Sequence, residues 1–142
     1  MLYLSIVITQ RYHYRNNTYH IGGTVMDIHY YADGRGCQPV YDWIKYIEKH
    51  DKATWRKFYQ LQVMLKENGK EIHAGKIKRK DIKKLKGTDI WQLRINENRV
   101  LFFYFSGEAI VFTNQFQKKQ NDTPQNEIDR AENRKLEWIQ NQ

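Results

Sequence analysis

The sequence predicts an α+β domain with a small antiparallel sheet, a helical hairpin near the N-terminus and a helix at the C-terminus. Two observations carry this prediction. Apolar residues recur at spacings of three and four over two segments before residue 70, and they alternate with a period of two after residue 90. Helices grouped ahead of a run of strands that are joined by short turns are typical of α+β folds.

The composition indicates one folded domain with an anionic partner. Of the 142 residues, 40% are hydrophobic and 14% aromatic, which is too many for a disordered chain. The 24 Lys and Arg residues outnumber the 16 Asp and Glu residues and give a net charge of +8. A single cysteine, Cys37, excludes an internal disulfide, and no apolar run is long enough to span a bilayer. We therefore expect a cytoplasmic protein with no membrane partner.

The first 25 residues differ in character from the rest. Residues 1–24 contain two arginines but no acidic residue, and no helical or strand period persists in them after Ile8. A second methionine, Met26, follows at once. We expect residues 1–25 to be an extension outside the domain, with Met26 as the working start and residues 26–142 as the domain.

Two amphipathic helices are expected after a short strand at residues 28–31. Pro39 suits the first position of a helix. The apolar residues that follow it have helical spacing: Val40, Trp43, Ile44 and Ile47. A second helix is predicted over residues 52–67, with Asn68-Gly69 as its stop. Together they form the hairpin.

The strands and the last helix follow from a change of period. Residues 90–95 alternate apolar and polar side chains, and residues 99–105 are apolar on both faces, as in a central strand. Residues 108–116 form the next strand. The last helix has Thr123 as its N-cap and Pro124 at its first position. Its expected buried stripe comprises Ile128, Ala131, Leu136 and Ile139.

Most of the charge lies in residues 76–86, which we call the basic segment. Seven of its residues are basic and one is acidic, so it carries +6 of the net +8. A solvated face that serves only solubility is an equal alternative for a lysine run alone. Three apolar residues within it (Ile77, Ile82 and Leu85) favour a fixed strip along a phosphate backbone. Its candidate RNA contacts are Lys76, Lys78, Arg79, Lys80, Lys83, Lys84 and Lys86.

The strand register gives a second group of candidates. If residues 97–98 and 106–107 are two-residue hairpin loops, Arg94 pairs with Leu101 and shares one face with Arg99. The same register places Asn114 and Phe116 on this face, and Lys118 and Lys119 follow just beyond the strand. The rest of this face is expected to be core, formed by Leu101, Phe103, Ile110 and Phe112. Ordinary surface arginines are the alternative that spacing alone favours, since a slip of one residue would turn a strand over.

This group suits RNA binding and phosphoryl chemistry. Cations beside an aromatic ring fit a nucleic-acid backbone with stacked bases, and Asn114 and Phe116 are the candidate base contacts. RNA cleavage by the 2′-hydroxyl needs a base, an acid and stabilisation of charge on the phosphorus. Arg94 and Arg99 supply only the last of these, because arginine does not deprotonate. Lys118 or Lys119 is the candidate acid or base. The histidines lack ligand spacing, so we expect no metal and no cofactor.

Several short motifs occur in a distinctive order from about Met26 to the C-terminus. They are YDWI at 41–44, KLKG at 84–87, IWQLR at 90–94, RVLFFY at 99–104, FQKK at 116–119 and TPQNEI at 123–128, followed by Ala131. In order and spacing they resemble the phage-derived HigB-type branch of the RelE/ParE toxin superfamily.

The resemblance implies a RelE-like fold and the toxin of a type II toxin–antitoxin system. Such toxins are metal-independent endoribonucleases (mRNA interferases) that cut mRNA on the ribosome and inhibit translation, and a helix-turn-helix antitoxin neutralises them. The family's sheet arginines fall at Arg94 and Arg99, and its basic pair falls at Lys118 and Lys119. Some relatives carry a late Tyr or His for acid–base chemistry, whereas residues 120–130 contain neither.

Two other functions stay open. ParE-type relatives inhibit gyrase instead of cutting RNA, although the basic segment favours mRNA. A non-catalytic nucleic-acid-binding accessory protein of a mobile element is the third possibility.

Overall fold

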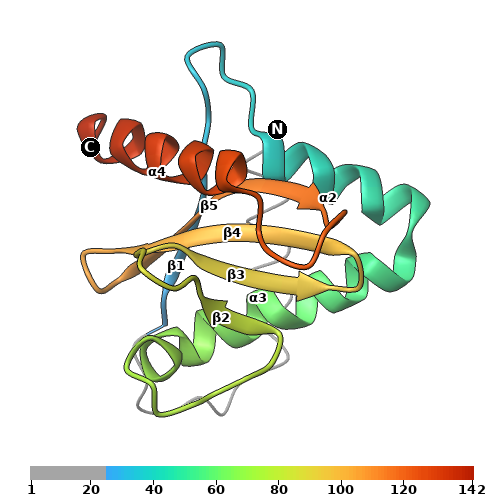
Figure 1. Ribbon diagram of the computed structural model, residues 1–142, viewed down its shortest axis with the longest axis horizontal. Helices are drawn as coiled ribbons and strands as arrows, with labels where there is room; N and C mark the ends of the chain where they lie inside the picture. Colours follow the sequence, from blue (N-terminus) through green and yellow to red (C-terminus); the bar gives the residue numbers. More distant parts are fainter. Residues whose placement is uncertain (1–24) are drawn as a thin grey trace.

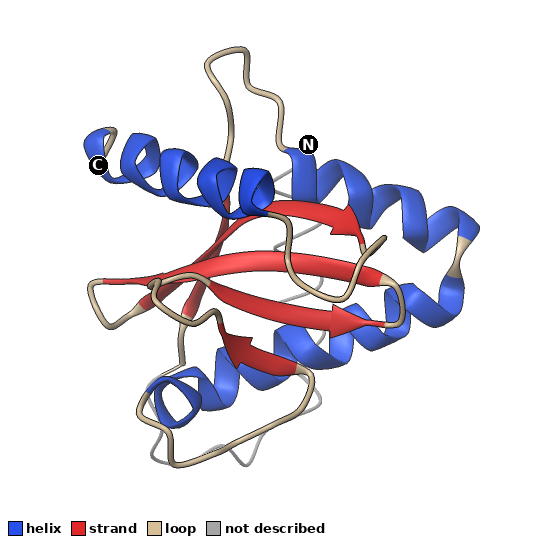
Figure 2. Cartoon of the chain, in the orientation of Figure 1, coloured by secondary structure: helices blue, strands red, loops and turns tan. Residues whose placement is uncertain are grey.

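A five-stranded sheet with helices on both faces forms the body of the protein (Figures 1 and 2). The computed structural model describes residues 25–142, and the predicted extension over residues 1–25 lies, apart from Val25, outside the described residues. None of the helices in the described part is long and apolar enough to cross a membrane. The elements are β1 (Asp27–Tyr30), α2 (Pro39–His50), α3 (Lys52–His73), β2 (Ile82–Lys84), β3 (Trp91–Ile95), β4 (Asn98–Phe105), β5 (Ala109–Gln117) and α4 (Gln125–Gln140).

The sheet has the strand order β1-β5-β4-β3-β2. The pairs β2–β3, β3–β4 and β4–β5 are antiparallel, whereas β1 runs parallel to β5. The α+β class is therefore confirmed, but the sheet is mixed where the sequence predicts an antiparallel one. No hairpin constrains the direction of β1, because two helices and three strands separate it from β5 along the chain.

The helical hairpin is confirmed, with a longer second helix than predicted. Pro39 occupies the first turn of α2, and the Asp51 carboxylate caps α3 by accepting from the Thr54 main-chain N–H at 3.2 Å. The predicted stop at Asn68 is a kink, with φ −123° and ψ 16°, after which α3 continues to His73. A Cβ at Gly69 would lie 2.9 Å from Met26 Cγ, so this glycine permits a close approach instead of ending the helix.

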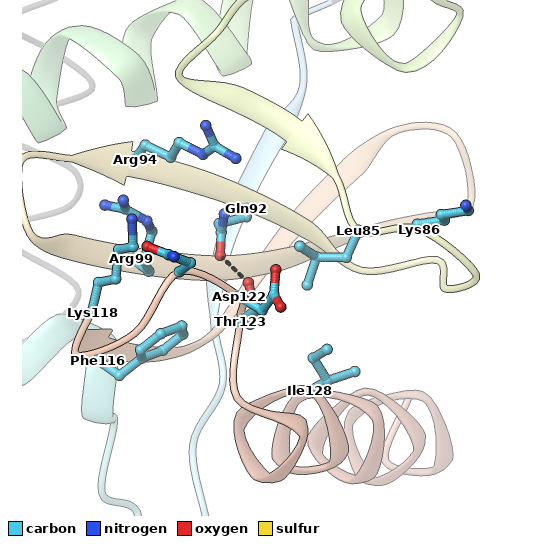
Figure 3. Close-up of a pocket in the computed structure, with 11 residues that line it drawn as sticks. Leu85, Lys86, Gln92, Arg94, Arg99, Phe116, Lys118, Asp122, Thr123 and Ile128 are labelled. Atoms are coloured by element: carbon cyan, nitrogen blue, oxygen red, sulfur yellow. Dashed lines mark hydrogen bonds between the residues drawn. The ribbon is translucent and has the colours of Figure 1, made fainter.

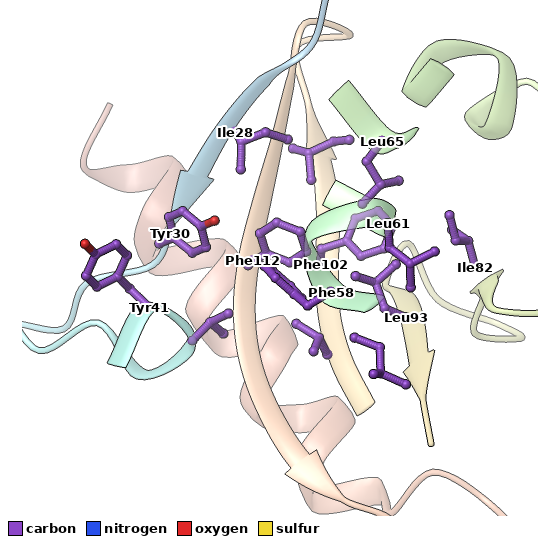
Figure 4. Close-up of a cluster of buried hydrophobic side chains, with 14 of the residues drawn as sticks. Ile28, Tyr30, Tyr41, Phe58, Leu61, Leu65, Ile82, Leu93, Phe102 and Phe112 are labelled. Atoms are coloured by element: carbon purple, nitrogen blue, oxygen red, sulfur yellow. The ribbon is translucent and has the colours of Figure 1, made fainter. Parts of the chain in front are cut away.

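The two faces of the sheet have separate cores. On one face, which we call the hairpin face, α2 and α3 cover the sheet, and Phe58 and Leu65 of α3 pack against Phe102 and Phe112 (Figure 4). The other face, which we call the α4 face, has a smaller buried cluster under α4: Ile90, Leu101, Phe103, Val111 and Ala131.

The helix α4 is rotated relative to the prediction. Ala131 is buried as expected, but Leu136 is 57% exposed and Ile139 is 38% exposed. Trp138 faces the sheet instead, with its ring edge-on to Phe105 at 4.8 Å between centroids. The predicted stripe is therefore wrong in its last two turns, because the large indole sets the phase of the helix.

The hairpin register differs from the prediction at both turns. The first turn is Asn96-Glu97, in which Asn96 takes a left-handed φ of 54°, so Arg94 pairs directly with Arg99. The second loop has three residues, and Phe105 pairs with Ala109. This shift moves two predicted α4-face residues, Ile110 and Phe112, to the hairpin face.

A β-bulge restores the predicted face beyond this point. Phe102 pairs with Phe112 and Leu101 pairs with Asn114, which leaves Thr113 as the extra residue on β5. Asn114 and Phe116 therefore return to the face of Arg94 and Arg99, as predicted. The bulge cancels the one-residue error in the preceding loop.

Candidate functional site

A cleft of about 390 Å³ lies on the α4 face between the sheet and the segment that leads into α4 (Figure 3). Four cationic side chains and one carboxylate line it, together with amide, hydroxyl and apolar groups. We call it the cationic cleft. Its lining residues are Leu85, Lys86, Gln92, Arg94, Arg99, Phe116, Lys118, Asn121, Asp122, Thr123 and Ile128.

Two arginines on adjacent strands form the centre of the positive charge. Arg94 and Arg99 are direct cross-strand partners, so their side chains share one face. Arg99 Nη1 donates to the main-chain carbonyls of Asn96 at 2.6 Å and Asn98 at 2.9 Å, which fixes its guanidinium. Burial lowers the pKa of Arg99, and the charge of Arg94 lowers it further, with Glu97 opposing both. The guanidinium nevertheless stays charged.

The segment between β5 and α4 is tied to the sheet at both ends. The Lys118 main-chain N–H donates to the Glu97 carbonyl at 2.7 Å. The Thr123 hydroxyl donates to Gln92 Oε1 at 2.9 Å, the dashed line in Figure 3. Gln92 is only 3% exposed, so this hydrogen bond satisfies a buried amide oxygen. These contacts hold the segment that carries Lys118 and Asp122 against the sheet, where both residues line the cationic cleft.

Phe116 and Asn114 take different roles although they share a face. Phe116 is the cross-strand partner of Arg99 and lines the cationic cleft. Asn114 is 2% exposed, and its Nδ2 donates to the main-chain carbonyl of Glu127 at 3.3 Å. The structure thus uses Asn114 to fix the start of α4 against β5, and this side chain does not reach the cleft surface.

The two predicted lysines after β5 separate. Lys118 lines the cationic cleft, whereas Lys119 lines another cleft, of about 600 Å³, between α2, the end of β5 and the start of α4. We call this the second cleft. Consecutive residues of an extended chain point in opposite directions, which explains the separation.

An acidic residue anchors the basic segment. The Asp81 carboxylate accepts from Arg79 Nε at 2.8 Å, from Arg79 Nη2 at 3.0 Å and from Lys57 Nζ on α3 at 2.9 Å. The hydrogen bonds from Arg79 are the largest cause of a pKa for Asp81 of about 2, well below its ordinary value. Arg79 is therefore engaged in an ion pair within the protein, and its predicted contact with RNA stays a prediction.

The other cations of the basic segment lie on both sides of the sheet edge. Lys83 pairs with Gln92 and so belongs to the α4 face, whereas Lys84 pairs with Trp91 on the hairpin face. Lys86 lines the cationic cleft. The remaining three are exposed between α3 and β2: Lys76, Lys78 and Lys80. The basic segment is anchored as predicted, but only part of it adjoins the cleft.

Four polar residues that line the cleft are not among the predicted site residues: Gln92, Asn121, Asp122 and Thr123. Thr123 is predicted as the N-cap of the last helix, but Pro124 holds that position and the Thr123 hydroxyl binds Gln92 instead. Asp122 is the one carboxylate among the lining residues. Asp122 could have been found from its position in the short segment between β5 and α4, because this segment must pass close to the sheet arginines.

The part of the chain that the structure describes holds no group of three or more His, Cys, Asp or Glu side chains placed to bind a metal ion. Cys37 is free and exposed.

Most of the chain matches a known protein family. Residues 45–136 match the model of a family described as "Phage derived protein Gp49-like (DUF891)". The matched region covers well over half of the chain, from within α2 into α4, and includes every residue that lines the cationic cleft. No curated protein matches the chain.

Proposed function

The chain belongs to the Gp49-like family of phage-derived proteins, which is part of the RelE/HigB-like toxin group, and on this basis we propose that it is the toxin of a type II toxin–antitoxin system. We further propose that it is a HigB-type mRNA interferase, an endoribonuclease that cuts mRNA on the ribosome and inhibits translation. The observation that carries this proposal is the cationic cleft, where Arg94, Arg99 and Lys118 surround a space that also holds Asp122.

The cleft suits one phosphate of a single RNA strand. Two arginines in direct cross-strand register repel each other, and an anion bound between them relieves that repulsion. Phe116 provides an aromatic ring beside the phosphate site, on which a base can stack. Lys86, which lines the cleft, and Lys83, which belongs to the same face of the sheet, extend the positive charge along the RNA strand.

The reaction that these groups serve is attack of an RNA 2′-hydroxyl on the adjacent phosphorus. The bond between O2′ and phosphorus forms and the bond to O5′ breaks, giving a 2′,3′-cyclic phosphate and a 5′-hydroxyl. We assign Asp122 as the base that accepts the 2′-hydroxyl proton and Lys118 as the acid that protonates O5′. Arg94 and Arg99 stabilise the charge that develops on the phosphorane oxygens, so no metal ion is needed.

A toxin of this group implies an antitoxin partner. We propose a small helix-turn-helix antitoxin encoded by a neighbouring reading frame. The complex would keep the cleft inactive until the antitoxin is degraded.

Primer extension on cellular mRNA after induced expression tests the proposal. The wild-type protein should give discrete, translation-dependent cuts, and Arg99→Ala should reduce them by about 10²–10³-fold, as expected when a donor to a developing oxyanion is lost. The matched control is Arg56→Ala, which removes an exposed arginine of α3 on the other side of the sheet and should leave the cuts intact.

Two outcomes would contradict the proposal. Growth arrest with intact mRNA and DNA breaks would support gyrase inhibition. Absence of growth arrest would support a non-catalytic accessory role.

A further inference from the structure

The second cleft results from the unequal lengths of two neighbouring strands. The short strand β1 pairs with Ala109–Phe112 only, so residues 113–117 of β5 have no strand beside them on that side in the described part of the chain. The end of β5 lines the second cleft there, together with α2 and the first turn of α4. The second cleft adjoins the cationic cleft, because Phe116 lines both.

Aromatic side chains form one wall of the second cleft. Tyr46 is 61% exposed, and its ring rests against the His50 ring with 4.6 Å between centroids. Trp43 also lines the cleft, and its ring stands edge-on to Phe58 of the core at 5.7 Å. Exposed rings that are held by their neighbours offer a stacking surface at small entropic cost.

Polar side chains complete the lining, and most of them are neutral. Gln117, Gln120 and Asn126 present amide groups, which can both donate and accept hydrogen bonds. Lys119 is the one cation among the lining residues. The one acidic lining residue, Glu127, is paired with Arg130. This combination fits a neutral, planar ring with hydrogen-bonding edges.

We propose that the second cleft binds one unpaired base of the RNA strand whose phosphate lies in the cationic cleft. This inference rests on the proposed nuclease function and adds a base-recognition subsite to it. A strand that crosses Phe116 places a phosphate near Lys118 and the adjoining nucleotide near Lys119, since these lysines are consecutive and face different clefts. The base stacks on Tyr46, and the amide groups read its edge.

A peptide strand added to the open edge of β5 is the competing occupant. That edge is already partly used, because Arg134 Nη1 donates to the Thr113 main-chain carbonyl at 2.9 Å. The continuity with the cationic cleft through Phe116 therefore favours RNA over a peptide.

Mapping of the cut sites in cellular mRNA tests the subsite, with Tyr46→Ala as the variant and Tyr46→Phe as the matched control. The wild type should prefer certain bases at one position beside the cut. Tyr46→Ala should weaken that preference about tenfold while cuts persist, because stacking of one base on an aromatic ring accounts for a loss of this size. Tyr46→Phe keeps the ring and should keep the preference.

Three results would overturn the subsite and leave the nuclease intact. The first is a wild-type cut pattern without base preference beside the cut. The second is an unchanged preference in Tyr46→Ala. The third is weaker binding of the co-expressed antitoxin by Tyr46→Ala with unchanged cuts, which would assign the cleft to a peptide. An absence of cuts by the wild type would instead overturn the proposed function and, with it, the subsite.

Discussion

The hairpin face of the sheet is covered by α2 and α3, whereas the α4 face is covered by one helix (Figure 2). The first face buries the rings of Phe58, Phe102 and Phe112 in one continuous core. The second buries a smaller cluster near Ala131, and its remaining part carries Gln92 and the two arginines. Incomplete cover leaves a stretch of rigid strand on which charged side chains can meet a ligand, because the opposite face already supplies the stability.

The largest effect that separates the two faces should follow from truncation of a core ring. Phe58 is fully buried and contacts the rings of Trp43 and Phe112. We expect Phe58→Ala to lower the free energy of unfolding by about 3–5 kcal/mol, through lost burial and the cavity left behind. The control is Phe116→Ala on the cleft side, where the ring is only partly buried and the loss should be smaller. Equal losses of unfolding free energy in the two variants, measured by urea denaturation, would contradict the view that the hairpin face supplies most of the stability.

Local patterns predicted the helical hairpin well, because its apolar spacing is a property of consecutive residues. Local patterns do not predict the direction of β1, because it depends on pairing with β5, which lies near the other end of the chain. Phe116 lies on the predicted face of the sheet although the predicted register is wrong. The loop after β4 is one residue longer than predicted, and the bulge at Thr113 compensates for that residue. The side of α4 that faces the sheet is set by the packing of Trp138 on Phe105, with Leu136 left exposed. The spacing of apolar residues alone does not show which of these two side chains is buried.

The sheet arginines were predictable, whereas the rest of the site depended on tertiary contacts. Arg94 and Arg99 share a face in any register that keeps the parity of a hairpin. The separation of Lys118 from Lys119 and the burial of Asn114 depend on how the chain returns from β5 to α4. Asp122 belongs to the same return segment, and its role as base stays a prediction.

The next effect concerns the edge of the sheet, where Asp81 ties the basic segment to α3. Its pKa of about 2 in the folded protein lies below the ordinary 3.8, so the associated stability is present above pH 4 and is lost as the pH falls through 2. We expect the free energy of unfolding to fall by at most about 2 kcal/mol between pH 5 and pH 2. Solvent screening of the partly exposed Lys57 and Arg79 makes the fall smaller. Asp81→Asn should lose correspondingly less over this range in urea titrations. An unchanged pH dependence in the variant would show that the anchor contributes nothing.

A smaller loss of stability should come from the bond that holds the return segment over the cleft. Thr123→Val removes the hydroxyl that donates to the buried Gln92 oxygen, and we expect a cost of about 1–2 kcal/mol together with reduced mRNA cutting. The double variant Gln92→Leu with Thr123→Val removes both partners and should recover most of the stability but not the cutting. Recovery of both would mean that the position of this segment has no part in the activity.

The smallest effect should have the opposite sign. Arg94 lies directly across from Arg99, and like charges in this arrangement destabilise a sheet. We expect Arg94→Gln to raise the free energy of unfolding by a few tenths of a kcal/mol at low ionic strength while it lowers mRNA cutting. Arg56→Gln on α3 also reduces the net charge by one unit and should change neither quantity. A loss of stability in Arg94→Gln would mean that the arginine pair supports the fold. A gain in stability together with a loss of mRNA cutting would mean that the two arginines serve ligand binding on the uncovered part of the α4 face and destabilise the fold.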